Sequence, residues 1–343
     1  MPGQARRTYR VAAVQAAPAF LDLRASVARC IGLIDEAAEA GAALIAFPET
    51  FIPGYPWWIW HHSPVSSFRH GFFERYFENA LSYDSPEAGM LADAAARRGV
   101  VAVFGLAERS GGSLYIGQWV VSSSGATLLR RRKLKPTHVE RSVFGEGAGA
   151  DLAVVDSELG RLGALNCWEH LQPLSKYAMY AQNEQIHVAA WPSLSSGEGR
   201  PVYALGHEVN NAASQVYAAE GGCFVLAPCA VVSQEMVDTI CVDDSQRAAF
   251  ARGGGRAMIY GPDGRPLSEP RDPEWEGLVL AEVDLGRIAL AKSVADPAGH
   301  YARPDVTRLL LNRAPAPPVM DWKPAEDAHQ AAGWVSAEEP RVP

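Results

Sequence analysis

The chain has 343 residues, of which 48% are hydrophobic and 20% are charged. This balance is typical of a globular protein and excludes wholesale disorder and collagen-like repeats. Asp and Glu number 39 against 31 Lys and Arg, so the net charge of −8 argues against a nucleic-acid-binding protein, which needs a basic surface. No apolar run approaches the roughly 20 residues of a membrane-spanning helix. We therefore expect a cytoplasmic protein that binds neither nucleic acid nor membrane.

Short apolar runs alternate with amphipathic stretches along the first half of the chain. Strands are predicted at residues 10–16, 44–47, 100–108, 114–122 and 126–132. Helices are predicted at residues 23–40, 66–81 and 86–98. The last of these has Pro86 in its first turn and Gly99 beyond its end, which are the usual positions of these residues at helix termini.

The alternation continues in the second half of the chain. Strands are predicted at residues 152–155, 161–166, 186–191 and 223–227, followed by a final pair, 258–260 and 278–283, around the turn at residues 262–264. Helices are predicted at residues 173–182 and 202–219. Alternating strands and helices favour an α/β fold, and groups of consecutive strands indicate that its sheets are mixed.

The cysteines and histidines give no sign of a disulfide framework or a metal site. The five cysteines are an odd number and none are spaced as CxxC, and the nine histidines lack metal-ligand spacing. Residues 313–343 hold 6 of the 24 prolines and show no apolar periodicity, so we expect a tail there rather than part of the core.

Glu49, Lys133 and Cys167 each stand at the end of a predicted strand. Taken singly, each has a structural explanation: a solvated or helix-capping acid, part of the basic run 130–135, and a buried cysteine. Together they supply a thiol nucleophile, a carboxylate for proton transfer and an ammonium group that stabilises negative charge. Such a set fits covalent catalysis at an electrophilic carbon bonded to nitrogen.

Five ordered blocks of the sequence resemble the nitrilase superfamily, and within it the nitrilases proper. They are residues 47–56 (FPETFIPGYP), 132–141 (RKLKPTHVER), 163–170 (GALNCWEH), 190–193 (AWPS) and 296–301 (DPAGHY). The resemblance covers roughly residues 8–312. We therefore expect one carbon-nitrogen hydrolase domain over 8–312 and a Pro-rich C-terminal tail over 313–343.

The resemblance implies a four-layer αββα sandwich with mixed sheets and an active site at the sheet ends. Glu49, Lys133 and Cys167 match the family's catalytic triad, and Glu140 matches a second glutamate that holds or assists it. Two segments, 55–83 and 233–253, look like the insertions of oligomer-forming nitrilases. The resemblance thus also implies a homo-oligomer larger than a dimer, of which an open spiral is one form.

The activity implied is that of a thiol nitrilase, which converts a nitrile to a carboxylic acid and ammonia through a thioimidate and a thioester on the cysteine. No cofactor or metal is needed, because the thiol does the covalent work and no redox step occurs. Tyr55, Trp168 and Trp191 lie in or beside the matched blocks and are predicted to bind the substrate, which favours an aromatic or arylaliphatic nitrile. The alternative is that these rings only pack the core.

Other functions stay open at this point: an amide or carbamoyl hydrolase with the same triad, a cyanide hydrolase or hydratase, and, in another class, a non-catalytic oligomeric scaffold. Glu169 and His170 flank Cys167 and are expected to anchor its loop or a subunit contact. His138 is expected to be a hydrogen-bonded loop residue rather than a second base, and no role is assigned to Asn166.

Overall fold

The computed structural model describes residues 8–194, 202–314 and 319. The chain divides into two units, Met1–Arg313 and Ala314–Pro343. The predicted tail lies almost entirely outside the described residues. Within the described ranges, no helix is long and apolar enough to cross a membrane.

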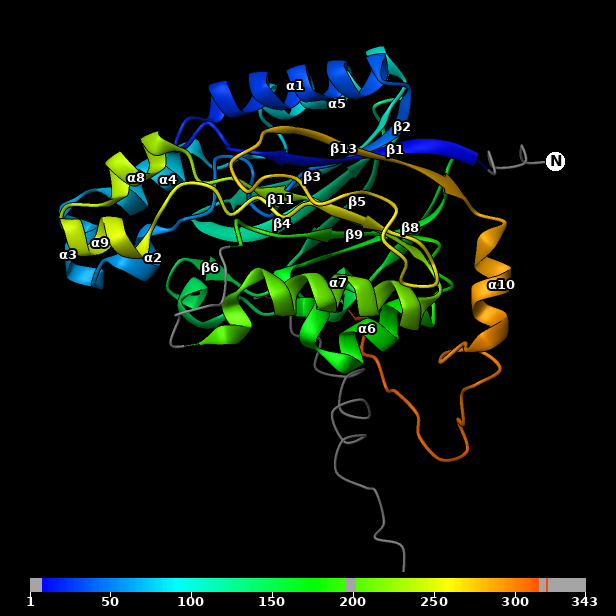
Figure 1. Ribbon diagram of the computed structural model, residues 1–343. Coiled ribbons are helices and arrows are strands. Elements are labelled where there is room, and N and C mark those ends of the chain that lie inside the picture. Colours follow the sequence, from blue (N-terminus) through cyan, green and yellow to red (C-terminus); the bar gives the residue numbers. More distant parts are fainter. Residues whose placement is uncertain (1–7, 195–201, 315–318, 320–343) are drawn as a thin grey trace, which may run out of the picture. The chain divides into compact units, whose positions relative to one another are not determined.

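The first unit contains two β-sheets with helices on either side (Figure 1). The strands of the larger sheet are β1 (Thr8–Ala16), β2 (Ala42–Ala46), β3 (Val101–Ser110), β4 (Ser113–Val121), β5 (Thr127–Arg132), β6 (Phe144–Gly145), β11 (Cys229–Ala230) and β13 (Gly277–Asp284). The strands of the smaller sheet are β7 (Val154–Ser157), β8 (Gly160–Asn166), β9 (Ile186–Ala190), β10 (Phe224–Ala227) and β12 (Met258–Tyr260).

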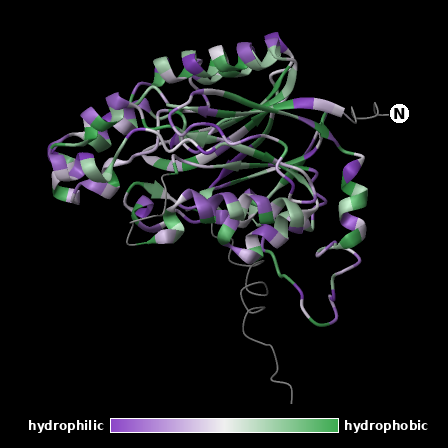
Figure 2. Ribbon diagram, viewed as in Figure 1, coloured by the Kyte–Doolittle hydropathy of each residue, from purple (hydrophilic) through white to green (hydrophobic). Residues whose placement is uncertain are grey.

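The helices cover the outer faces and the ends of the sheets. They are α1 (Leu23–Glu39), α2 (Trp58–His61), α3 (Pro64–Arg69), α4 (Phe72–Asn79), α5 (Pro86–Arg98), α6 (Pro173–Tyr180), α7 (His207–Gly221), α8 (Gln234–Ile240), α9 (Asp244–Ala249) and α10 (Arg287–Val294). Helices α1 and α7 mix hydrophilic and hydrophobic residues along their length, as expected of outer layers, while the strands are richer in hydrophobic residues (Figure 2).

The side chains of β1 show how the layers form. Val11 and Ala13 belong to the apolar cluster that includes both sheets, whereas Ala12 and Val14 belong to a second cluster with residues of α1 and α5. Successive residues of a strand point to opposite faces, so the larger sheet is buried on both sides at β1. The αββα sandwich implied by the resemblance is confirmed.

Both sheets are mixed, as predicted. The larger sheet runs β11-β1-β2-β3-β4-β5, with β13 along β1 and β6 along β4, and the smaller runs β12-β10-β9-β8-β7. β1, β2 and β3 are mutually parallel, as are β8, β9 and β10, while β4, β5, β7, β12 and β13 join antiparallel.

Two predictions about individual elements are wrong. Residues 258–260 and 278–283 do not pair, because β12 joins β10 in the smaller sheet and β13 joins β1 in the larger one. The turn after β12 closes locally instead, with Leu267 N donating to Ile259 O at 2.8 Å. The predicted helix 66–81 is interrupted at Gly71, whose φ of 62° separates α3 from α4.

The two segments interpreted as insertions pack against each other and form one insertion subdomain, defined here as residues 55–83 and 233–253. They share an apolar cluster in which the rings of Trp57 and Phe250 lie 5.5 Å apart. His62 Nε2 lies 2.7 Å from Ile240 O, which joins the segments further. Helices α2, α3, α8 and α9 therefore gather at one end of the sandwich (Figure 1).

The loop after β2 is held against β3 by a glycine. Ile52 N donates to Gly105 O at 3.3 Å, and Ala107 N donates to Ile52 O at 2.7 Å, so the loop runs alongside the strand. A Cβ atom at Gly105 would lie 1.8 Å from Pro48 O, which no side chain can tolerate. The glycine at 105 therefore allows Pro48 to approach β3 closely, and this contact sets the position of Glu49, the residue after Pro48.

Candidate active site

Lys133 lies between two carboxylates in the interior of the protein. Its Nζ donates to Glu49 Oε1 and to Glu140 Oε2, both at 2.8 Å. All three side chains are buried. Burial alone would lower the pKa of Lys133, but the charges of Glu140 and Glu49 outweigh it and hold that pKa well above its ordinary value. Lys133 is therefore a fixed cation.

Three elements bring these groups together. Lys133 directly follows β5, and its N donates to Ile116 O of β4 at 2.7 Å. Glu49 follows β2, and its N donates to Trp191 O, beyond the end of β9, at 3.3 Å. Glu140 lies in the short 3₁₀ helix η1 (His138–Ser142). The structure thus brings together three of the four predicted catalytic residues through direct contacts.

Glu140 is held by three donors. Besides Lys133, it accepts from Thr137 N at 2.6 Å, in a capping box at the start of η1, and from the Tyr55 hydroxyl at 2.9 Å. A carboxylate with this many donors is a positioned acceptor rather than a free base. Tyr55, predicted to bind substrate, is buried, and its hydroxyl donates its hydrogen bond to Glu140.

Glu49 differs from Glu140 because one of its oxygens is free. Oε2 is buried and has no hydrogen-bond partner among the described residues. Burial raises the pKa of Glu49 to about 8, with Lys133 opposing the rise and Glu140 adding to it. A carboxyl group with a pKa near neutrality and an open oxygen can both take up and return a proton.

Cys167 follows β8 and opens the 3₁₀ helix η3 (Cys167–Leu171) with a φ of 46°. Burial and then the charge of Glu49 raise the pKa of its thiol well above the ordinary value, and the Lys133 charge offsets this only in part. The resting group is therefore a thiol that needs a base. Thr50 and His138 also have positive φ, at 47° and 46°, so local backbone strain of about 1–3 kcal/mol each gathers at the turns of this site.

Glu169 connects the turn of Cys167 to the strand of Lys133. It accepts from Arg131 Nη2 at 2.7 and 2.9 Å, from Leu134 N at 2.8 Å and from Asn166 N at 2.8 Å. Burial would raise the pKa of Glu169, but the charge and hydrogen bonds of Arg131 and the two amide donors bring it below the ordinary value. The expectation that Glu169 anchors its loop agrees with these contacts.

Arg131 is a site residue that the sequence reasoning missed. The sequence places Arg131 in the basic run 130–135 without a role of its own, yet Arg131 and Lys133 are each only 1% exposed. The signal was available in the strand alternation: residues 131 and 133 are two apart and point to the same face. Arg130 and Arg132, on the other face, lie over the rings of Tyr83 and Tyr115.

The remaining predicted residues lie in different surroundings. Trp191 is buried in the apolar cluster and its Nε1 donates to Ser214 Oγ at 2.9 Å. His138 stacks on Trp60 with ring centroids 5.4 Å apart, and its carbonyl accepts from Arg141 Nε at 3.2 Å. Both polar atoms of the Asn166 side chain are buried without a partner in the described part of the chain.

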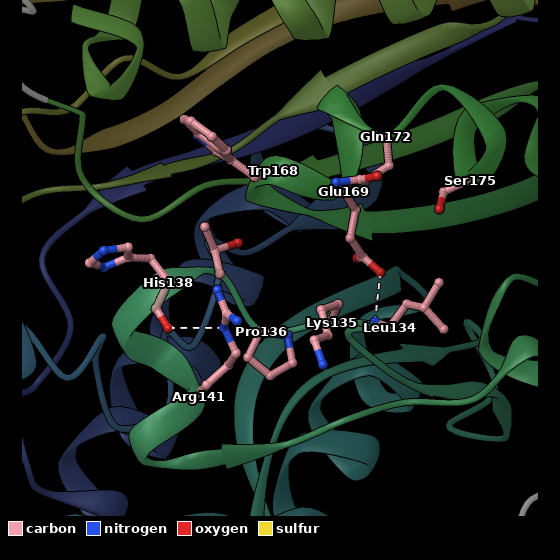
Figure 3. Close-up of a pocket in the computed structure, with 10 residues that line it drawn as sticks. Leu134, Lys135, Pro136, His138, Arg141, Trp168, Glu169, Gln172 and Ser175 are labelled. Carbon is pink, nitrogen blue, oxygen red and sulfur yellow. Dashed lines mark hydrogen bonds between the residues drawn. The ribbon is translucent and has the colours of Figure 1, made fainter. Parts of the chain in front are cut away.

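Trp168 lines a cavity of about 420 Å³ beside the turn of Cys167. Figure 3 shows Trp168 and His138 on one side of it, with Glu169 reaching toward Leu134. The other lining residues are Lys135, Pro136, Thr137, Arg141, Gln172 and Ser175. The wall is thus part aromatic or apolar and part polar, as is usual for a small-molecule site.

Comparison with known proteins places this chain in a family. The family model described as carbon-nitrogen hydrolase matches residues 10–293. A nitrilase of Pseudomonas syringae pv. syringae is 56% identical over 312 residues, covering 91% of this chain and 92% of the relative. The chain belongs to the nitrilases of the carbon-nitrogen hydrolase family.

Other nitrilases of this family are also similar. An aliphatic nitrilase of Rhodococcus rhodochrous is 49% identical over 91% of this chain and 85% of its own length. An arylacetone-specific nitrilase of Alcaligenes faecalis is 48% identical over 90% and 86%. A crystal structure of a carbon-nitrogen hydrolase from Helicobacter pylori superposes with a TM-score of 0.68 at 18% identity, over 88% of this chain and 97% of that one, and so shares the fold.

Glu49→Gln should abolish the increase in the alkylation rate of Cys167 that ionisation of Glu49 causes as pH rises. In the wild type, alkylation of Cys167 by iodoacetamide should accelerate as pH rises through about 8, because Glu49 becomes an ionised base over that range. Glutamine cannot accept the proton, so the variant should react slowly until the thiol itself ionises at higher pH. Glu108→Gln, which alters a buried carboxylate paired with Arg132, is the matched control. Equal pH profiles for Glu49→Gln and wild type would contradict the role of Glu49 as base.

Proposed function

We propose that this nitrilase hydrolyses nitriles to carboxylic acids and ammonia with Cys167 as nucleophile, Glu49 as base and acid, and Lys133 as the stabilising cation. The observation that carries this assignment is the buried contact of Lys133 with Glu49, whose second oxygen is open, in an electrostatic field that also acts on the Cys167 thiol. Glu140 acts on Lys133 by holding its ammonium group in place.

The reaction follows from these groups. Glu49 takes the thiol proton, the thiolate of Cys167 adds to the nitrile carbon, and the nitrile nitrogen is protonated to give a thioimidate. Lys133 stabilises the negative charge that develops on nitrogen. A water deprotonated by Glu49 then adds to the same carbon and ammonia leaves, giving a thioester. A second water releases the carboxylic acid and restores the thiol.

Cys167→Ala is expected to reduce nitrile turnover by at least about 10⁴-fold while the protein stays folded, because the variant lacks the thiol that forms the covalent intermediate. Cys30→Ala is the matched control, since Cys30 is a buried cysteine of α1, away from the site. Ammonia and acid release should be measured together with circular dichroism. Substantial turnover by folded Cys167→Ala would overturn the assignment.

The rival activities use the same triad, so only substrates can separate them. A nitrile, its amide and cyanide should be compared with ammonia, acid and amide all quantified. We expect the nitrile to be converted fastest, since the family relatives are nitrilases. A non-catalytic scaffold would convert none of the three, and its Cys167 would show no enhanced reactivity toward iodoacetamide.

We further propose that the preferred nitriles carry an aromatic or arylaliphatic group. The printed names of the relatives include both aliphatic and aryl specificities, so the support comes from the cavity, where Trp168 and His138 offer aromatic surface. Tyr55 and Trp191 act on the substrate through the two carboxylates. The Tyr55 hydroxyl donates to Glu140, and the Trp191 carbonyl accepts from Glu49 N.

Trp168→Ala should lower kcat/KM for phenylacetonitrile about 10-fold more than for a short aliphatic nitrile, because it removes apolar surface that only the aromatic ring can cover. Trp119→Phe, a change on the outer side of the larger sheet, should lower neither. Wild-type enzyme that prefers the aliphatic nitrile or cyanide by tenfold would refute the aromatic-pocket argument and leave the triad assignment standing.

The homo-oligomer expected from the sequence, with an open spiral as one form, is also kept as a proposal. The insertion subdomain supports it, because α3 exposes the large apolar side chains of Val65 and Phe68 at 60% and 66%. Light scattering should give a mass above that of a dimer, and changing both residues to serine should lower it. An active monomer would contradict the proposal. The 8–312 domain boundaries, the 313–343 tail and the cytoplasmic location stay predictions.

A further inference from the structure

A hydrogen-bonded chain of buried side chains starts at the backbone carbonyl of Cys167 and is not used in the chemistry described above. His170 Nδ1 lies 2.7 Å from the carbonyl oxygen of Cys167. His170 Nε2 lies 2.8 Å from His187 Nε2, and His187 Nδ1 lies 2.7 Å from Glu184 Oε1. The chain ends at Tyr217, whose hydroxyl donates to Glu184 Oε2 at 2.7 Å. All these side chains are buried.

The number of protons in this chain follows from its contacts. Between the Cys167 carbonyl and the Glu184 carboxyl there are three short contacts, and each needs one proton to be a hydrogen bond. Two neutral imidazoles supply two protons, one per ring. The carbonyl of Cys167 cannot donate, and the Tyr217 proton is already used on the other carboxyl oxygen. The third proton must therefore sit on Glu184 or make one histidine a cation.

The surroundings favour Glu184 as the carrier. Burial raises the pKa of Glu184 to about 8, and burial lowers the pKa of both histidines well below the ordinary value. The charged or titratable groups that face the chain are Arg131 and Glu169 beside the histidines, and Tyr217, Tyr180 and Cys223 beside Glu184. Arg131 is already paired with Glu169, and among the described residues Glu184 is joined to His187 and Tyr217 but to no Lys or Arg side chain.

We propose that Glu184 works as a neutral carboxylic acid and, through His187 and His170, holds the carbonyl of Cys167 so that the strained turn presents the thiol to Glu49. The order of protons is then Glu184 to His187 Nδ1, His187 Nε2 to His170 Nε2, and His170 Nδ1 to Cys167 O. These are positioning residues, because none of them touches the reacting atoms. The inference rests on the proposed role of Cys167 as nucleophile.

Loss of the third proton breaks one of the three contacts whichever way the imidazoles rearrange. If both rings keep their tautomers, His187 Nδ1 faces a carboxylate with no proton between them. If they reverse, His170 presents a lone pair to the carbonyl of Cys167 and the clamp on the nucleophile is lost. Ionisation of Glu184 should therefore limit the rate at alkaline pH, in the opposite sense to the gain from ionising Glu49.

Glu184→Gln tests this directly, because a carboxamide reproduces the neutral acid: its N–H can donate to His187 Nδ1 and its oxygen can accept from Tyr217. The variant should keep kcat within about threefold at neutral pH, and its alkaline fall in kcat should shift upward by about one pH unit or more. Tyr180→Phe is the matched control, since Tyr180 packs against Tyr217 but donates to Glu220, outside the chain. It should leave the alkaline limb in place.

Infrared spectroscopy of the substrate-free enzyme gives an independent measurement. The difference between wild type and Glu184→Gln at neutral pH should contain the carbonyl stretch of a protonated carboxyl group, and this band should disappear as pH rises above 8. Because no nitrile is involved, the band tests the chain even if the proposed substrate is wrong. An ionised carboxylate at neutral pH would overturn the proposal, as would a folded but inactive Glu184→Gln or an unchanged alkaline limb.

His170→Asn serves if Glu184→Gln does not fold. Asparagine can still donate one N–H to the carbonyl of Cys167 but cannot reach His187, so the nucleophile's turn is uncoupled from Glu184. The alkaline fall should again move to higher pH, with KM unchanged. An alkaline limb identical to that of wild type in this variant would also overturn the proposal.

Discussion

The site depends on one buried ammonium group, that of Lys133, between two carboxylates. Removing a cation from water costs several kcal/mol even after relaxation, and this is offset only where the partners are well placed and their other lone pairs are satisfied. Glu140 meets this condition with two further donors, while Glu49 keeps one oxygen open. The close approach at Gly105, the capping box of η1 and the contact from Tyr55 all place these two carboxylates.

Much of this arrangement could be predicted because its signals are local. Pro86 and Gly99 mark the ends of α5, which spans Pro86–Arg98 as predicted. Alternating apolar runs identify most strands of both sheets. The resemblance points to Glu49, Lys133, Glu140 and Cys167 because each lies in a long matched block. A match of that length also indicates where in the family's fold the block lies.

What could not be predicted depends on contacts between segments far apart in the chain. β12 and β13 are neighbours in sequence yet enter different sheets, because the edges that receive them belong to β10 and β1. His170 contacts His187 on β9 and, through it, Glu184 in the loop before β9 and Tyr217 on α7, and no local pattern marks these partners. No local pattern shows that Trp191 is buried in the apolar cluster and that its Nε1 donates to Ser214.

Two hydrogen bonds connect the insertion subdomain to Lys133 and its two carboxylates. Trp60 Nε1 donates to the Tyr55 hydroxyl at 3.2 Å, and Tyr55 in turn donates to Glu140. The segment after Tyr55 therefore supports the site and cannot be removed without affecting it. A deletion that joined residue 54 to residue 84 would leave Glu140 one donor short inside the protein. Loop-grafting between this chain and a relative without the segment must therefore carry residues 55 and 60 together, so that Glu140 keeps its donor and that donor keeps its own partner.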